Sequence, residues 1–109
     1  MTTVYKVLGQ QNPTANTLTT LYTVPASNSA VISTITVANL DTNAANFSLA
    51  VRPAGASINS KHYINYNASL AGNDTITATL GITMAATDVL SVNTSSSLVA
   101  FSAFGSEIY

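Results

Sequence analysis

Hydrophobic and polar residues alternate along most of the chain. In one clear example, the apolar residues Phe47, Leu49 and Val51 are separated by smaller or more polar side chains. A β-strand points successive side chains to opposite faces, so an alternation of this kind predicts a strand with one buried face.

A second alternating run predicts another half-buried strand. In residues 74–82, threonine and glycine alternate with apolar residues that should share one face: Ile76, Ala78, Leu80 and Ile82. Between such runs lie clusters of Gly, Pro, Asn, Asp and Ser, which are typical of turns. Together these signals predict about eight short strands, near residues 4–9, 19–24, 30–38, 46–52, 61–67, 74–82, 87–93 and 98–104.

The pattern predicts an all-β protein. No segment combines a helix cap with an amphipathic stripe of useful length, and Val, Ile and Thr are frequent in the predicted strands. A chain of 109 residues fits one domain, 1–109, around a single core. We expect an antiparallel β-sandwich with either jelly-roll or immunoglobulin-like connectivity. Residues 1–11 and 105–109 either extend from it as arms or form ordinary edge strands.

Charged residues are rare in this chain. It has three Lys or Arg residues and four Asp or Glu residues, 6% of its length, whereas ordinary soluble domains contain roughly 25%. A free monomer normally uses interspersed charge to remain dispersed, so we expect partners to cover much of this surface. Three scattered cations supply too weak a field for a phosphate backbone, so we expect no nucleic-acid partner.

The sequence also carries signals about location. The N-terminus has no charged segment followed by an apolar run, so it does not resemble a secretory signal. No stretch approaches about 18 uninterrupted apolar residues, so we expect no membrane span and no membrane partner. Cysteine is absent, which favours assembly in a reducing compartment. We therefore expect a protein made in the cytoplasm.

Apolar or aromatic side chains occur on both alternating faces of three segments, 61–66, 89–92 and 98–104. Either these are central strands covered by loops, or their outward residues form a subunit or partner interface. Interfaces are rich in aromatics and poor in charge, so the low overall charge favours the second interpretation. The candidate interface residues are Tyr5, Tyr63, Tyr66, Val99, Phe101 and Tyr109.

The residue sets required for catalysis or metal binding are missing. With one histidine and no cysteine, the usual zinc ligands cannot be assembled in one subunit. We expect His62 to be a strand residue with its ring at the surface or at an interface. Asp41, Asp74 and Asp88 lie in turns or at strand entries, where a carboxylate caps backbone amides. No Gly-x-Ser-x-Gly motif or phosphate-binding glycine loop occurs, so we expect no enzyme activity and no cofactor.

Two binding functions are weaker alternatives. Thr75, Thr77 and Thr79 form a row of the kind that binds ice, but three residues on one strand make too small a plane. A carbohydrate-binding module is the stronger alternative, because β-sandwiches often hold sugars against aromatic rings beside Asn or Asp partners. In this chain the residues that fit such a role are Tyr63, Tyr66 and Asn65.

Several strand and turn motifs carry a family resemblance: residues 20–25 (TLYTVP), 46–55 (NFSLAVRPAG), 61–66 (KHYINY), 73–77 (NDTIT), 86–92 (ATDVLSV) and 104–108 (FGSEI). Over nearly its whole length the chain resembles small virion proteins of tailed phages, especially those that infect cyanobacteria. The resemblance implies a β-sandwich of the capsid decoration or cement type, located on the capsid surface. It implies two partners, the major capsid protein and further copies of this chain in a homodimer or homotrimer. Tail, baseplate and fibre components share this architecture, so the motifs do not identify the place in the particle.

Overall fold

Eight strands and two short 3-10 turns make up the computed structural model, which describes residues 1–109. The prediction of an all-β fold is confirmed, and the strands follow one another in the expected order. Neither helical turn is long and apolar enough to cross a lipid bilayer. In chain order the elements are β1 (Thr3–Gln11), β2 (Thr19–Thr23), β3 (Ser29–Asn39), β4 (Ala45–Arg52), η1 (Pro53–Gly55), η2 (Ser60–His62), β5 (Tyr63–Leu70), β6 (Thr75–Met84), β7 (Val89–Thr94) and β8 (Val99–Ile108).

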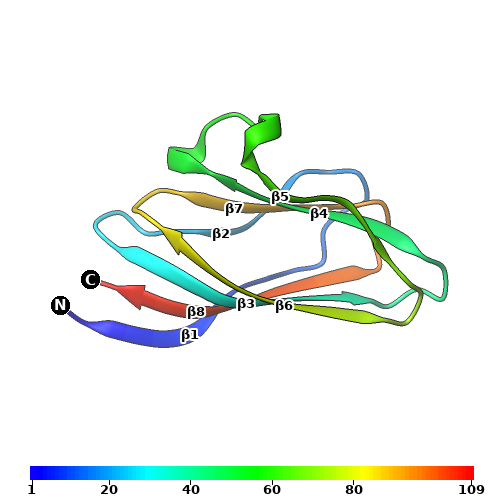
Figure 1. The fold of residues 1–109 in the computed structure, drawn as a ribbon, viewed down its shortest axis with the longest axis horizontal. Coiled ribbons are helices and arrows are strands. Elements are labelled where there is room, and N and C mark those ends of the chain that lie inside the picture. The colour runs from blue at the N-terminus through cyan, green and yellow to red at the C-terminus, as the bar shows by residue number, and fades with distance from the viewer.

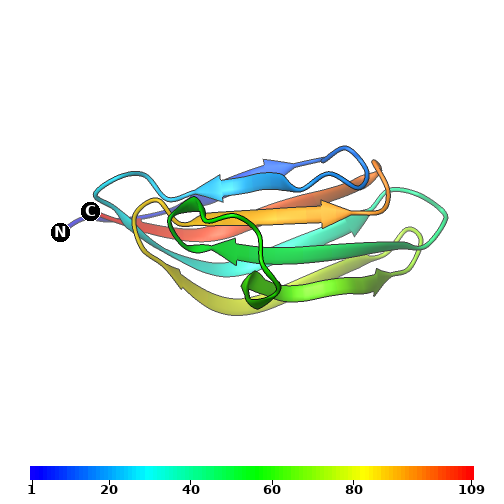
Figure 2. The same ribbon diagram turned by 90° about the horizontal axis from the view of Figure 1, so that it is seen from above.

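The strands form two four-stranded antiparallel sheets that lie face to face (Figure 1). One sheet has the order β1-β8-β3-β6. The other has the order β2-β7-β4-β5, which is visible from above in Figure 2. This is the strand order of an eight-stranded jelly roll, and it differs from the arrangement of an immunoglobulin domain. Of the two connectivities that the sequence left open, the structure has the first.

The hydrophobic core fills the space between the two sheets and contains 17 buried residues. Within the core, Phe47 of β4 meets Phe101 of β8 edge to face, with ring centroids 6.4 Å apart. Complete burial of a side chain of this size stabilises the fold by roughly 1.5–3 kcal/mol. Phe47, Leu49 and Val51 lie in this core or pack against it, as their spacing predicted.

Two of the six candidate interface residues belong to the core. Val99 and Phe101 are 0% and 1% exposed. They point inward because alternate residues of β8 share its inner face, while Ala100, Ser102 and Phe104 point outward. The prediction that Val99 and Phe101 form an interface is therefore wrong.

A β-bulge interrupts the alternation expected for residues 74–82. Gly81 has a φ of +67°, which glycine adopts without strain. At this point the pairing of β6 with β3 shifts by one residue. Ile76 and Ile82 pack against the core, but Leu80 is 42% exposed. The prediction that Leu80 shares their face is wrong because Leu80 and Gly81 both lie in the register shift between Thr79 and Ile82, where neither has a partner on β3, and the alternation resumes at Ile82.

Both ends of the chain belong to strands of one sheet. β1 pairs with β8 along its length, and beyond the strands Thr2 and Tyr109 exchange backbone hydrogen bonds. Residues 1–11 and 105–109 are therefore not free arms. β1 forms the edge of the sheet, whereas β8 lies between β1 and β3. The N- and C-termini consequently lie side by side at one end of the sandwich (Figure 1).

A partly buried ionic cluster joins the two sheets near these termini. Glu107 of β8 is 5% exposed and accepts a hydrogen bond from the hydroxyl of Tyr22 on β2, and its other oxygen lies 2.9 Å from the Lys6 ammonium on β1. The hydrogen bond from Tyr22, followed by that from Lys6, lowers the pKa of Glu107. Burial, followed by the contact with Glu107, raises the pKa of Tyr22 above its ordinary value.

His62 lies outside the strands. It is the last residue of η2, it is 8% exposed, and its Nδ1 accepts a hydrogen bond from the backbone N–H of Asn59. The prediction of a surface or interface histidine in a strand is wrong. The chain leaves the sheet after Arg52 and re-enters it only at Tyr63, so His62 caps a turn in the excursion between β4 and β5.

Candidate binding surfaces

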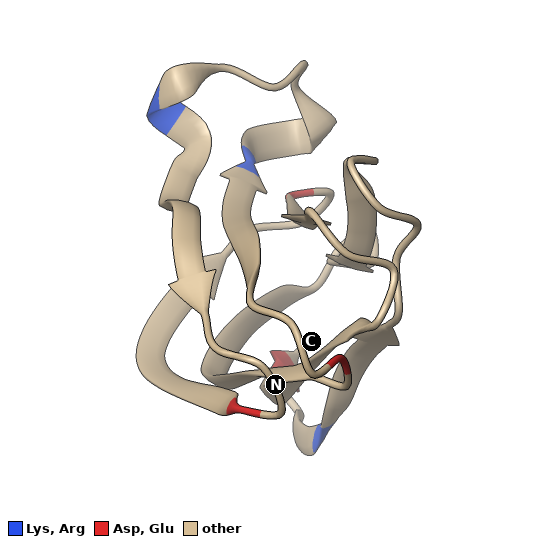
Figure 3. Cartoon of the chain, turned by 90° about the vertical axis from the view of Figure 1, so that its right-hand side faces the viewer, with Lys and Arg blue, Asp and Glu red and all other residues tan.

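Most charged residues lie in loops or at the ends of strands, as the coloured segments of Figure 3 show. Asp41, Asp74 and Asp88 each accept hydrogen bonds from backbone N–H groups, which confirms the capping role predicted for them. Asp88 uses both carboxylate oxygens, one for Ala54 and one for Ala85, at 2.9 Å each. No three His, Cys, Asp or Glu side chains form a group that could hold a metal ion.

Arg52 also has a structural role. Its Nε donates to the hydroxyl of Ser91 at 3.0 Å, and its terminal nitrogen donates to the carbonyl oxygens of Gly55 and Ala56. The guanidinium thereby holds the start of the β4–β5 excursion against β7. This cation is therefore already engaged within the protein.

The outer face of the β1-β8-β3-β6 sheet carries no charged side chain. The two charged residues of its strands, Lys6 and Glu107, contact each other on the inner side. Paired residues of neighbouring strands share a face, so the register identifies the outward set. We call this surface the uncharged face, and its residues are Thr3, Tyr5, Val7, Gln10, Val31, Thr34, Thr36, Ala38, Thr75, Thr77, Thr79, Thr83, Ala100, Ser102, Phe104, Ser106 and Ile108.

One half of the uncharged face is apolar. Tyr5 is 84% exposed and Val7 is 50% exposed, and Val7 lies opposite Phe104 in the sheet. Val31 approaches the same region from β3, and these side chains border a shallow hollow of about 640 Å³, which is also lined by Lys6, the partner of Glu107. An exposed patch of apolar and aromatic side chains without charge is typical of a protein–protein contact.

The other half of the uncharged face is rich in hydroxyl groups. Thr34 lies opposite Thr79, and Thr36 lies opposite Thr77. The sequence revealed only the threonine row of β6, and the strand pairing adds a second row from β3. A hydroxyl group both donates and accepts hydrogen bonds, so this region can bond to a partner without ionised groups.

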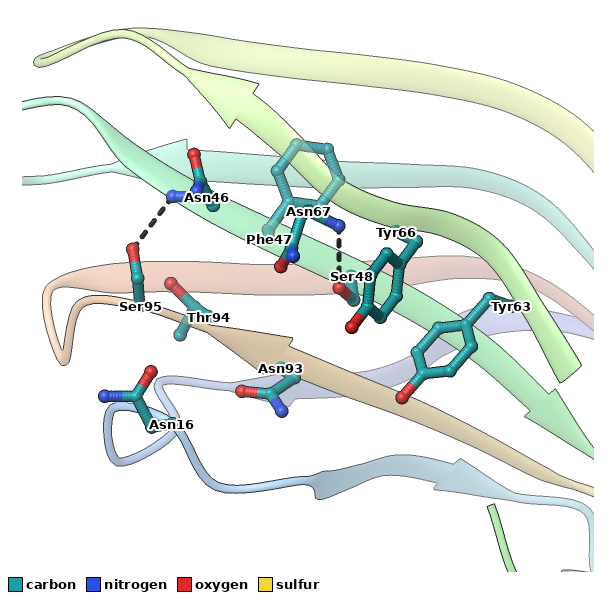
Figure 4. Close-up of a pocket in the computed structure, with 10 residues that line it drawn as sticks. All are labelled: Asn16, Asn46, Phe47, Ser48, Tyr63, Tyr66, Asn67, Asn93, Thr94 and Ser95. Atoms are coloured by element: carbon teal, nitrogen blue, oxygen red, sulfur yellow. Dashed lines mark hydrogen bonds between the residues drawn. The ribbon is translucent and has the colours of Figure 1, made fainter. Parts of the chain in front are cut away.

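The opposite sheet carries a groove beside two tyrosines (Figure 4). Tyr63 and Tyr66 of β5 lie edge to face, with ring centroids 4.8 Å apart. Residues three apart on a regular strand point to opposite faces. Here the pairing of β5 with β4 shifts twice within this stretch, which brings both rings to the outer side.

The groove has a volume of about 310 Å³ and is lined mainly by uncharged polar residues. The backbone N–H groups of Asn46 and Asn67 donate to the hydroxyls of Ser95 and Ser48, at 2.9 and 3.0 Å. The side-chain amides around the groove have no hydrogen-bond partner within the protein and remain open to solvent. We call this site the Tyr/Asn groove, and its defining residues are Tyr63, Tyr66, Asn16, Asn46, Asn67, Asn93, Ser48 and Ser95.

Sequence reasoning missed the four asparagines of this groove. They come from the β1–β2 loop and from three different strands, and only the fold brings them together (Figure 4). Asn65, which the sequence suggested as a sugar-binding partner of Tyr63 and Tyr66, does not line the groove. The other exposed candidates lie elsewhere, with Tyr5 on the uncharged face and Tyr109 at the C-terminal end.

Comparisons of this chain with protein-family models, with curated proteins and with solved structures found no match. The two surfaces described above are therefore the basis on which a function is inferred.

Proposed function

We propose that this protein is a non-enzymatic structural protein of a tailed-phage particle and that it decorates the capsid by binding the major capsid protein. The observation that carries this proposal is the uncharged face, on which Tyr5 and Val7 remain exposed and the one nearby cation, Lys6, is already paired with Glu107. The resemblance of the strand and turn motifs to small virion proteins supports the same role.

A neutral surface suits a position in a repeated lattice. Copies of a decoration protein stand close together, and like charges on neighbouring copies would repel one another. With 6% charged residues, adjacent copies pack with little repulsion. Many weak contacts then add up across the shell, because each bound copy is held near its neighbours.

The two halves of the uncharged face would contribute differently to such a contact. The apolar half around Tyr5 and Phe104 offers area to bury against the major capsid protein, and the threonine rows offer hydrogen bonds around it. The free edge of β1 and the exposed Tyr109 lie beside this face. A neighbouring copy in a homodimer or homotrimer would contact the protein there.

The fold supports the proposal by analogy. Jelly rolls include viral capsid domains as well as lectins, so the topology is compatible with a particle role without selecting it. The capsid proposal therefore rests on the uncharged face and on the motif resemblance, and not on the topology.

The copy number and position of the protein in a purified particle test this proposal. A decoration role requires on the order of hundreds of copies on the shell, measured by quantitative mass spectrometry and located by cryo-electron microscopy. About six or twelve copies at the tail would overturn the capsid role in favour of a tail, baseplate or fibre component. Absence of the protein from particles would overturn both.

The substitution Tyr5→Lys tests the uncharged face directly. It places a charge in the apolar half, and we expect shell occupancy to fall by about tenfold or more. Leu40→Lys is the matched control, because it adds the same charge to a side chain that is 61% exposed in the β3–β4 loop. An equal loss with both variants would argue against a contact through the uncharged face.

A further inference from the structure

The Tyr/Asn groove lies on the sheet opposite the uncharged face, so the proposed capsid contact leaves it open. The groove combines exposed aromatic rings, unpaired side-chain amides and a complete lack of charge. None of these features is needed to hold the sandwich together. Taken together, they point to a ligand of one chemical class.

The tyrosine pair offers an exposed aromatic surface at one end of the groove (Figure 4). Tyr66 is 67% exposed, and the half-buried Tyr63 packs edge to face against it and supports its ring. A sugar ring presents patches of C–H groups, which pack against the electron-rich face of an aromatic ring. The hydroxyl groups of both tyrosines make no hydrogen bond within the protein and are free for a ligand.

The asparagine side chains offer hydrogen bonds of both kinds. Each amide presents two donor hydrogens and an acceptor oxygen. The hydroxyl groups of a sugar also donate and accept hydrogen bonds, so neutral amides can bind them without an ionised group on either side. Ser48 and Ser95 fix the neighbouring backbone through their bonds to Asn67 and Asn46, which keeps the groove in one shape before a ligand arrives.

Backbone geometry explains two of the four asparagines but not the others. Asn16 and Asn67 have positive φ values of 57° and 48°, a conformation that Asn tolerates better than most residues. Asn46 and Asn93 lie in strands without such a constraint, on the outer side of β4 and β7. Asn is unfavourable in strands, so these two positions are best explained by a role for their amides.

The lack of charge restricts the ligand further. None of the residues that line the groove is ionised, so a phosphate, a sulfate or an acidic sugar would find no cation to offset its charge. The volume of about 310 Å³ lies at the small end of ligand sites, which span roughly 300–1,000 Å³. This space suits about one or two sugar rings.

We propose that the Tyr/Asn groove binds a neutral saccharide, with a sugar ring packed on Tyr66 and its hydroxyls bonded to the amides of Asn67 and Asn93. This binding function goes beyond the proposed capsid role. The two are tested separately because they use opposite sheets and different measurements.

The test is a titration of the isotope-labelled protein followed by amide NMR shifts. The probes are glucose, galactose, mannose, N-acetylglucosamine and their β-linked disaccharides, each added up to about 10 mM, which covers the affinity of a weak single-sugar site. We expect saturable shifts at residues 63–67 and 93–95 with at least one probe. No saturable shift with any neutral probe, or shifts confined to other residues, would overturn the proposal.

Variants connect the signal to the groove. Tyr66→Ala should weaken binding by about tenfold or more, whereas Tyr66→Phe should keep most of it because the ring remains. Tyr5→Ala is the matched control, since it removes an even more exposed tyrosine from the opposite sheet and should leave binding unchanged. Equal weakening by Tyr66→Ala and Tyr5→Ala would overturn the assignment to this groove.

Charged probes test the class of ligand. Glucuronic acid should bind at least about threefold more weakly than glucose if glucose is bound, because its carboxylate has no cation to meet. If another neutral sugar binds best, the same comparison is made between that sugar and its own uronic acid. Equal or tighter binding of the acidic sugar would overturn the assignment to neutral saccharides.

Discussion

The two outer faces of this sandwich differ more than their shared lack of charge suggests. On the uncharged face, threonines pair across β3 and β6, and Tyr5, Val7 and Phe104 border a broad, shallow hollow. On the opposite face, the register shifts of β5 bring Tyr63 and Tyr66 to the edge of a smaller groove that is lined mainly by polar side chains. A broad, shallow and largely apolar surface fits another protein, and a smaller polar groove beside aromatic rings fits a small molecule. The same low-charge composition therefore forms two surfaces of different shape and chemistry, depending on local strand geometry.

Asparagines show the same contrast at the level of single residues. Asn39 is 3% exposed, and its amide nitrogen donates to the carbonyl oxygens of Asn43 and Ala71. That amide is fully used to hold loops together. The amide of Asn93 has no partner within the protein and points toward the Tyr/Asn groove (Figure 4). Identical side chains therefore serve structure in one place and are available for binding in another.

Both outer faces depend on the same hydrophobic core. The substitution Phe101→Asp is expected to give the largest loss of stability in this core. A carboxylate would replace a ring that is 1% exposed and packs against Phe47 from the other sheet. We expect a loss of unfolding free energy of about 4 kcal/mol or more, or no folded protein at all. Chemical denaturation measures the loss. A variant with a nearly normal midpoint would return Phe101 to the list of interface residues.

The next largest effect is expected from Glu107→Gln, which removes an ion pair between the neighbouring strands β1 and β8 without changing the side chains of either outer face. The amide keeps a contact with Tyr22 but loses the ion pair with Lys6. We expect a loss of about 1–3 kcal/mol in unfolding free energy, with saccharide binding unchanged. Denaturation and the NMR titration measure the two properties on the same sample.

The pH dependence of stability provides a second readout of this cluster. The pKa of Glu107 is lowered in the folded state, so its contribution is present above the ordinary pKa of about 4.3 and is lost as the pH falls below that value. The pKa of Tyr22 is raised, so its contribution is present below about pH 10 and is lost as the pH rises further. Thermal melting across this range should show both losses. Glu107→Gln should reduce the acid-side loss, and an unchanged acid profile would contradict this account.

A crossed experiment separates the two faces. Tyr5→Lys should lower assembly on particles while leaving saccharide binding intact, and Tyr66→Ala should do the reverse. Each loss should reach about tenfold, and both variants should fold because the two side chains are 84% and 67% exposed. Measuring both properties for both variants is the check. Loss of both properties in either variant would mean that the faces are not independent.

The smallest effect concerns Asn67, whose backbone and amide have separable roles. Its φ of 48° suits Gly, so Asn67→Gly should leave stability nearly unchanged, whereas Asn67→Ala should lower it by about 1 kcal/mol. Both variants lack the amide, and we expect both to weaken saccharide binding to a similar degree. Weakening by Ala alone would show that only the backbone conformation matters.

The sequence alone determined the all-β class, the approximate positions of the strands and the scarcity of charge. It also identified the capping aspartates, because a carboxylate beside a turn bonds to amides only a few residues away. Alternation is likewise a local property, and it correctly placed Phe47 and Leu49 in the core. Such features depend on neighbours in the chain, so they can be read before the fold is known.

Tertiary structure decided the rest. Alternation shows that a strand has two faces but not which one is covered, so Phe101 was assigned to the wrong side until the partner sheet was known. The register shift at Leu80 and Gly81 left Leu80 exposed, and the register shifts of β5 brought Tyr63 and Tyr66 together. The jelly-roll pairing, the burial of Glu107 and the gathering of four asparagines all join residues that are far apart in the chain. Each of these features depends on which strands pair and in which register. The alternation of side chains along one strand carries no information about that pairing.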